Sequence, residues 1–221
     1  MSTPHSPADT RRLLPDSPDA RVFIELASCI ADLTAAADTL DLAVRGRHEG
    51  GFISAAQSAL TDYAAVAYCR ADDKHKGAVR MSELIEIPVE RRPLHDLVHA
   101  YRSRFVAHSQ SDLSSTFAFV ALDEQGRPRA KLSTYTVHQP MPRTIIDQFR
   151  VLIADLLGVL SERQLLIASD IRRKLLQVDA SVAASWPQRP AISHAVIDDY
   201  DPRSLRARYP TTITLFWDQD A

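Results

Sequence analysis

Residues 17–45, SPDARVFIELASCIADLTAAADTLDLAVR, decide the fold class of this chain. Apolar side chains recur there at alternating spacings of three and four, at Phe23, Leu26, Ile30, Leu33, Ala37, Leu40 and Val44. This spacing places them in one narrow seam along an α-helix. Ser17 is a typical N-cap, Pro18 suits the first helical position and Asp19 suits the first turn. The stretch therefore predicts a long helix, ending before Gly46, that packs against other helices.

Three more helices and one hairpin are predicted further along the chain. Apolar and small residues predict a second helix over 52–70, a third helix begins at Pro93 and ends near His108, and a long fourth begins at Pro142. Between the last two, the strand-like segments TFAFVAL and AKLSTYTV, joined by a turn with a glycine, predict a β-hairpin over 116–137. We expect a mainly α protein: an up-down helical bundle with one inserted β-hairpin and an extended C-terminal segment.

The two ends of the chain differ in composition from this helical middle. Residues 1–16 are rich in Pro, Ser and Asp, and we interpret them as a flexible N-terminal arm. The helical domain with its hairpin is predicted to span 17–180. Residues 181–221 shift toward Pro, Trp and Asp, and form a C-terminal extension whose last apolar run, 211–217, is typical of a strand or an extended segment.

Composition argues against several classes of protein. The 221 residues are 45% hydrophobic and 24% charged, as in ordinary globular proteins, and the net charge of −2 creates no general attraction for nucleic acid. Cys29 and Cys69 lie in apolar helical patterns, which predicts buried thiols in a reducing compartment. Residues 1–21 contain no apolar run typical of a signal peptide, and no segment is apolar enough for a membrane span. We therefore expect a cytoplasmic protein without membrane contact.

The stretch YRSRFVAHS, residues 101–109, carries the strongest chemical signal. Arg102 can bind a phosphate, and His108 can transfer a proton near neutral pH. On an ideal helix these two side chains lie about 120° apart. They converge only if the helix ends or distorts between them, or if a symmetric partner completes the site. The alternative is an arginine in a surface ion pair and a histidine that the helix dipole favours.

The same stretch resembles the Arg-x4–6-His motif of HEPN domains (higher eukaryote and prokaryote nucleotide-binding). These all-α domains include many metal-independent ribonucleases of toxin–antitoxin, abortive-infection and CRISPR systems. The chain is most similar to the abortive-infection HEPN-like group, in which a Tyr-x-Arg element, here Tyr68-Cys69-Arg70, precedes the motif. The resemblance extends over residues 20 to 180. Ser103 stands where active members often carry Asn.

The resemblance implies a metal-independent endoribonuclease, a toxin or phage-defence component. The 2′-hydroxyl of RNA would be the nucleophile, His108 the general acid or base, and Arg102 the group that stabilises charge in the transition state. It also implies a homodimer, and an antitoxin protein as a further partner. Further RNA contacts are expected from Tyr68, Arg70, His99, Ser103 and Arg104. A non-catalytic helical module that binds RNA or protein as a scaffold stays open as the alternative.

His95 and His99 are a second candidate pair, because their i, i+4 spacing places both on one helix face, as in zinc peptidases. Asp96 stands between them where those enzymes use Glu, and no third ligand is indicated downstream, although His138 and His194 exist. We therefore favour a polar helix face, or a supporting position beside Arg102, over a zinc site. No cofactor and no metal ion are predicted, since the chain also lacks a glycine-rich phosphate loop.

Overall fold

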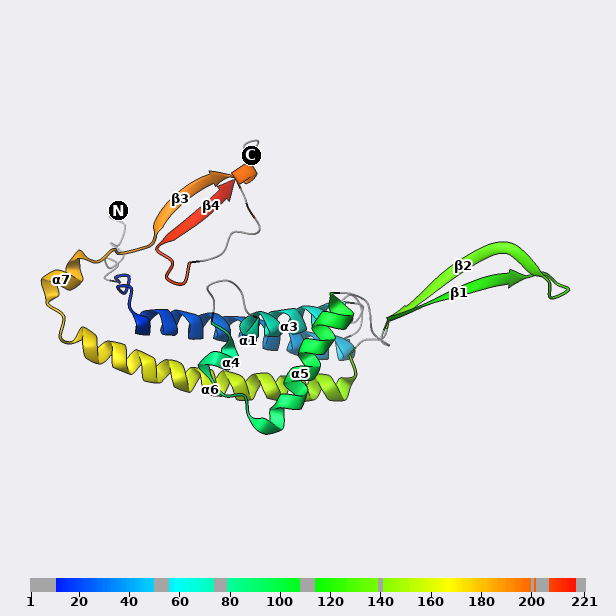
Figure 1. The fold of residues 1–221 in the computed structure, drawn as a ribbon, viewed down its shortest axis with the longest axis horizontal. Helices are drawn as coiled ribbons and strands as arrows, with labels where there is room; N and C mark the ends of the chain where they lie inside the picture. The colour runs from blue at the N-terminus through cyan, green and yellow to red at the C-terminus, as the bar shows by residue number, and fades with distance from the viewer. Residues whose placement is uncertain are drawn as a thin grey trace, which may run out of the picture. The chain divides into compact units, whose positions relative to one another are not determined.

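The computed structural model describes residues 11–49, 56–73, 79–107, 114–138, 141–199, 201 and 207–217. These residues are mainly helical, as predicted, and carry small two-stranded sheets (Figure 1). The antiparallel sheet is the predicted hairpin, whereas the parallel sheet near the C-terminus was not predicted. No helix in the described ranges combines the length and the apolar character that a bilayer crossing requires. The chain forms two compact units: unit 1 is Met1–Ser28, Lys74–Arg80 and Ser161–Ala221, and unit 2 is Cys29–Asp73 and Met81–Leu160.

The first helix, α1, spans Pro18–Glu49. Its N-cap is the predicted one, because the Ser17 hydroxyl accepts a hydrogen bond from the Ala20 N–H at 3.1 Å. The predicted end before Gly46 is wrong, because the helix continues to Glu49. A glycine in a helix interior costs only about 1 kcal/mol relative to alanine, which is too little to end a helix of this length.

The apolar seam of α1 is confirmed at its leucines and shifted at its other positions. Leu26, Leu33 and Leu40 are fully buried, as predicted. The alternate buried positions are Cys29, Ala36 and Ala43, whereas Ile30, Ala37 and Val44 are only half-buried. Small side chains thus occupy the deepest positions between the leucines, where they allow neighbouring helices to approach closely.

In unit 2, α3 (Gln57–Asp72) contacts several other helices. Its Tyr68 ring meets Phe149 of α6 (Arg143–Leu175) edge to face at 5.1 Å, and Arg70 forms a 2.8 Å ion pair with Asp32 of α1. Toward α5 (Arg92–Tyr101) it presents polar groups. The buried side chains of α6 all lie before Ser161, at Ile146, Phe149, Leu152, Ile153, Leu156 and Leu160. This part of α6 therefore completes the core of unit 2.

Short elements connect these helices. Between α3 and α5 lie α4 (Met81–Leu84) and the 3-10 turn Val89–Arg91, and Arg91 forms a 2.7 Å ion pair with Asp155 of α6.

The third predicted helix is confirmed, but α5 continues as a π-helix over Arg102–Val106. The Ala107 N–H donates to the Arg102 carbonyl at 3.0 Å. A helix distortion therefore lies within the Arg102–His108 motif, while His108 itself is outside the described residues.

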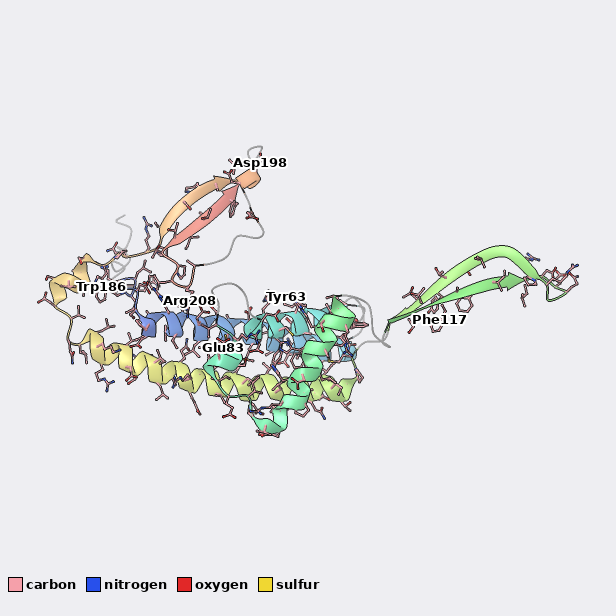
Figure 2. The ribbon with its side chains drawn as sticks, viewed as in Figure 1. Tyr63, Glu83, Phe117, Trp186, Asp198 and Arg208 are labelled. Atoms are coloured by element: carbon pink, nitrogen blue, oxygen red, sulfur yellow. The ribbon has the colours of Figure 1, made fainter. Side chains whose placement is uncertain are left out.

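The predicted hairpin is confirmed. Strands β1 (Ser114–Leu122) and β2 (Pro128–His138) pair antiparallel, and Gly126 adopts a φ of 76° in the turn between them. The Asp123 carboxylate accepts hydrogen bonds from the backbone N–H groups of Gln125 and Arg127, which closes the turn. Phe117, labelled in Figure 2, and Phe119 lie on one face of this ribbon, and both side chains are about half exposed.

Unit 1 contains the second sheet. Strand β3 (Ala191–Val196) pairs parallel with β4 (Thr212–Trp217), so the predicted run at 211–217 is a strand. The short helix α7 (Ala180–Ser185) begins at Asp179, whose carboxylate accepts from the Ser181 N–H. The Leu13 N–H donates to the Pro187 carbonyl at 2.7 Å, so part of the predicted N-terminal arm contacts the C-terminal extension.

Candidate functional site

Two pairs of polar side chains face each other in unit 2. Tyr68 and Asp72 are one turn apart on α3, and His95 and His99 are one turn apart on α5. Residues at i and i+4 share a helix face, so each helix presents two groups to the other. The buried alanines of α3 allow this helix to pack closely in the core. α5 begins at Arg92, and Pro93 suits its first turn.

The distances between these groups are short. His95 Nε2 lies 3.5 Å and His99 Nε2 lies 3.8 Å from Asp72 Oδ2. The Tyr68 hydroxyl is hydrogen-bonded to His95 Nδ1 at 2.7 Å, and the Ser82 backbone N–H donates to Asp72 Oδ1 at 2.8 Å. We call Asp72, His95 and His99 the His–Asp cluster. Its three ligand atoms all lie within 4.8 Å of one another, so together they could hold one metal ion.

One atom of the His–Asp cluster lacks a hydrogen bond. His99 Nε2 is buried, and no described residue forms a hydrogen bond with it. Leaving a buried polar atom unsatisfied costs about 1–3 kcal/mol, and native structures rarely do so without a functional reason. The atom faces the Asp72 carboxylate, at a distance too long for a hydrogen bond. It therefore marks a position where something else can bind.

The electrostatics of the cluster favour an ionised carboxylate beside a neutral imidazole. Burial of the Asp72 carboxyl opposes its ionisation, but hydrogen bonds from His95 and Ser82 outweigh that cost and hold the pKa of Asp72 at about 2. Burial lowers the pKa of His99, and the neighbouring His95 lowers it further, while nearby carboxylates only oppose the shift. Near neutral pH, Asp72 is an anion and His99 keeps a lone pair.

Arg102 lies beside this cluster without joining it. One of its terminal nitrogens forms a 3.5 Å ion pair with Oδ2 of Asp73, the residue that follows Asp72. The Arg102 side chain is 40% exposed, so its guanidinium is accessible to a ligand. The motif residue His108 lies outside the described residues.

The structure distributes the five predicted RNA contacts over several surroundings. Tyr68 and His99 meet in the polar interface, with their ring centroids 6.0 Å apart. Arg70 is directed to α1 by its ion pair with Asp32. The Ser103 hydroxyl donates to the His99 carbonyl at 3.0 Å, and Arg104 is exposed beside an apolar hollow of about 300 Å³. Of this set, Tyr68 and His99 are therefore brought together through their rings, and Ser103 joins them through the His99 backbone.

Sequence reasoning missed Asp72 and the hydrogen-bonding role of His95. A signal existed upstream of the histidines, because Tyr68 and Asp72 repeat the i, i+4 spacing of His95 and His99 on the preceding helix. The third ligand, Asp72, precedes the histidines in the chain instead of following them. The prediction of buried cysteines is confirmed, because Cys29 and Cys69 are both buried. Burial raises the pKa of Cys69 to about 12, so this thiol is unreactive.

No family model, no curated protein and no solved structure matches this chain. The resemblance to HEPN-like ribonucleases therefore stays a prediction that rests on the motif residues themselves.

Proposed function

We propose that this chain is a HEPN-like, metal-independent endoribonuclease that binds RNA phosphate through Arg102. The observation that carries the proposal is the state of Arg102, which is half-exposed where α5 opens into a π-helix. Its ion pair with Asp73 is long and engages one nitrogen, whereas a guanidinium has five N–H donors. Distortions of this kind occur frequently at functional sites.

The chemistry follows from RNA itself. The 2′-hydroxyl oxygen forms a bond to phosphorus while the bond from phosphorus to the 5′-oxygen breaks. His108 takes the proton of the 2′-hydroxyl as a general base or delivers a proton to the leaving 5′-oxygen as a general acid. Arg102 stabilises the charge that develops on the phosphate oxygens, with its planar set of donors. The products are a 2′,3′-cyclic phosphate and a 5′-hydroxyl.

The remaining parts of the proposal concern assembly. The helices of unit 2 form an up-down bundle, and two chains form a homodimer with α5 near the two-fold axis, so that Arg102 and His108 of two motifs line one cleft. The cellular location is the cytoplasm, and an antitoxin protein is a further partner. Light scattering should give about twice the 24.6 kDa mass of one chain at micromolar concentration; a monomer would contradict this arrangement.

The decisive experiment compares cleavage of a structured RNA pool by the wild type, His108→Ala, Arg102→Ala and Arg150→Ala. Arg150 is a control of matched exposure, because its side chain is 42% exposed but is held by Asp41 through two nitrogens. We expect His108→Ala to lose about 10²–10⁴-fold in rate and Arg102→Ala about 10²–10³-fold. Arg150→Ala should cleave like the wild type, and EDTA should leave every rate unchanged.

Two results would contradict the ribonuclease proposal. Equal cleavage by the wild type and His108→Ala would indicate a contaminating nuclease or another site. An equal loss in Arg102→Ala and Arg150→Ala would indicate a general effect of surface charge rather than phosphate binding. Arg102→Lys is expected to recover only part of the rate, since an ammonium group lacks the planar fork.

A second candidate function is a non-catalytic module that binds a protein. The exposed apolar side chains on one face of the hairpin favour it: Phe117, Phe119 and Tyr135 are between 50% and 62% exposed. Exposed apolar patches commonly mark interaction surfaces. Absence of cleavage across a broad RNA pool would favour this candidate over the first.

A further inference from the structure

The His–Asp cluster has a feature that the proposed ribonuclease chemistry does not use. Three ligand atoms converge, two of them imidazole nitrogens and one a carboxylate oxygen, and His99 Nε2 is buried without a hydrogen bond to any described residue. RNA cleavage through the 2′-hydroxyl needs no such arrangement. The cluster also lies on residues other than Arg102 and His108, so it calls for its own explanation.

The spacing of the ligand atoms fits a tetrahedral ion. Zinc bonds to nitrogen and to carboxylate oxygen are about 2.0–2.1 Å long, so two ligands of one ion lie about 3.4 Å apart. The observed distances from Asp72 Oδ2 are 3.5 Å to His95 Nε2 and 3.8 Å to His99 Nε2. Both distances lie within about 0.5 Å of this spacing.

The hydrogen bonds around the cluster leave these ligand atoms available. Tyr68 engages His95 through Nδ1, so His95 Nε2 is directed toward Asp72. If Nε2 binds a metal, Nδ1 carries the proton and donates it to the Tyr68 oxygen, which is the support that metal-bound histidines usually have. Ser82 likewise engages Oδ1 of Asp72, while Oδ2 faces His95 Nε2 at 3.5 Å, so an ion between these two atoms would replace their direct interaction. The supporting shell of a metal site is therefore already present.

We propose that Asp72, His95 and His99 bind one divalent transition-metal ion of the zinc class. Asp72 binds it through Oδ2 and each histidine through Nε2. Two imidazoles and a single carboxylate suit zinc and its neighbours better than magnesium or calcium, which prefer oxygen ligands. Three protein ligands leave a fourth position for water or for an oxygen of a substrate, as in catalytic zinc sites. The ion would join the end of α3 to α5, the helix that leads to Arg102.

The test uses the full chain without an affinity tag, stripped with a chelator, dialysed against Zn²⁺ and analysed for bound metal by mass spectrometry. We expect one zinc ion per chain, and a visible absorption spectrum of tetrahedral type when Co²⁺ replaces Zn²⁺. His194→Ala is the matched control, because His194 is an exposed histidine on β3 of unit 1, and it should keep the ion. His99→Gln and Asp72→Asn should lose it while keeping the circular dichroism of the wild type.

Two further measurements separate loss of the ion from loss of the fold. Tyr68→Phe keeps the aromatic packing but removes the bond to His95, so it should weaken zinc binding by about 10–100-fold. Zinc at about 100 times its Kd should raise the Tm of the wild type by roughly 5–10 °C and leave His99→Gln unchanged. Less than one zinc ion in ten chains, or equal binding by wild type, His99→Gln and Asp72→Asn, would overturn the proposal. Because these readouts measure metal, they hold whether or not the chain cleaves RNA.

Discussion

The His–Asp cluster and the β1–β2 hairpin both belong to unit 2, and each reverses the usual distribution of side chains. The cluster keeps a carboxylate and two imidazoles largely away from water, with side-chain exposures of 9%, 12% and 29%. The hairpin leaves Phe117 and Phe119 half-exposed and Leu132 77% exposed. Globular proteins normally bury apolar side chains and expose carboxylates and imidazoles.

Buried polar groups and exposed apolar groups are stabilised in different ways. A buried polar group is stabilised by hydrogen bonds from its own chain, and Tyr68 and Ser82 supply these for His95 and Asp72. An exposed apolar side chain gains stability only by contact with another surface. The cluster is therefore part of the folded unit, whereas the hairpin is suited to interaction with a partner. Departures from the usual pattern tend to occur at functional sites, so the His–Asp cluster and the hairpin are both candidates for such sites.

The largest effect is expected on the free energy of unfolding, and it shows whether the fold depends on the helices rather than on the hairpin. Phe149→Ala should lower the free energy of unfolding by about 3–5 kcal/mol, because Phe149 is fully buried against Tyr68. Phe119→Ala, the matched control on the hairpin, should change it by no more than about 0.5 kcal/mol. Urea denaturation followed by circular dichroism measures both. Equal destabilisation by the two variants would remove the distinction between the regions.

A smaller effect is expected within the cluster. Tyr68→Phe removes the hydroxyl that pairs with His95 Nδ1 and leaves that buried nitrogen without its partner. The metal-stripped protein should lose about 1–3 kcal/mol of unfolding free energy. Tyr135→Phe is the matched control, because the Tyr135 side chain is 62% exposed on the hairpin, and we expect no measurable change. If Tyr68→Phe matched this control, the hydrogen bond would contribute nothing to the fold.

A third prediction concerns only the hairpin. Replacing Phe117 and Phe119 together by Ser should leave the free energy of unfolding within about 0.5 kcal/mol of the wild type. The same variant should bind less of the dye ANS, because exposed apolar surface has been removed. Unchanged dye fluorescence would show that this aromatic face is covered in solution.

The smallest effect is a local titration in the hairpin turn. Hydrogen bonding to the Arg127 backbone, more than any other contact, lowers the pKa of Asp123 below its usual 3.8. A carboxyl whose folded pKa is lowered supports the turn above the usual value, and this support is lost as the pH falls through the folded pKa. In NMR spectra, the amides of Gln125 and Arg127 should therefore shift only below about pH 3.8. A midpoint at or above the usual value would show that the turn is open.

Local sequence patterns were enough to predict most of the elements. The cap at Ser17, the leucine seam of α1, the hairpin around Gly126 and the C-terminal strand β4 all follow from residues that are close together in the chain. Helix periodicity, capping and turn chemistry depend on neighbours within a few positions, so a single sequence carries that information.

Only the tertiary structure decided which elements share a site. It selected Cys29, Ala36 and Ala43 for the deep positions beside the leucines, because packing depth depends on how closely another helix approaches. It also brought Asp72 to His95 and His99, which lie more than twenty residues further along the chain, and it directed Arg70 to Asp32 instead. The sequence by itself determined the helices and their polar faces; the packing of those faces against each other determined the chemistry they enclose.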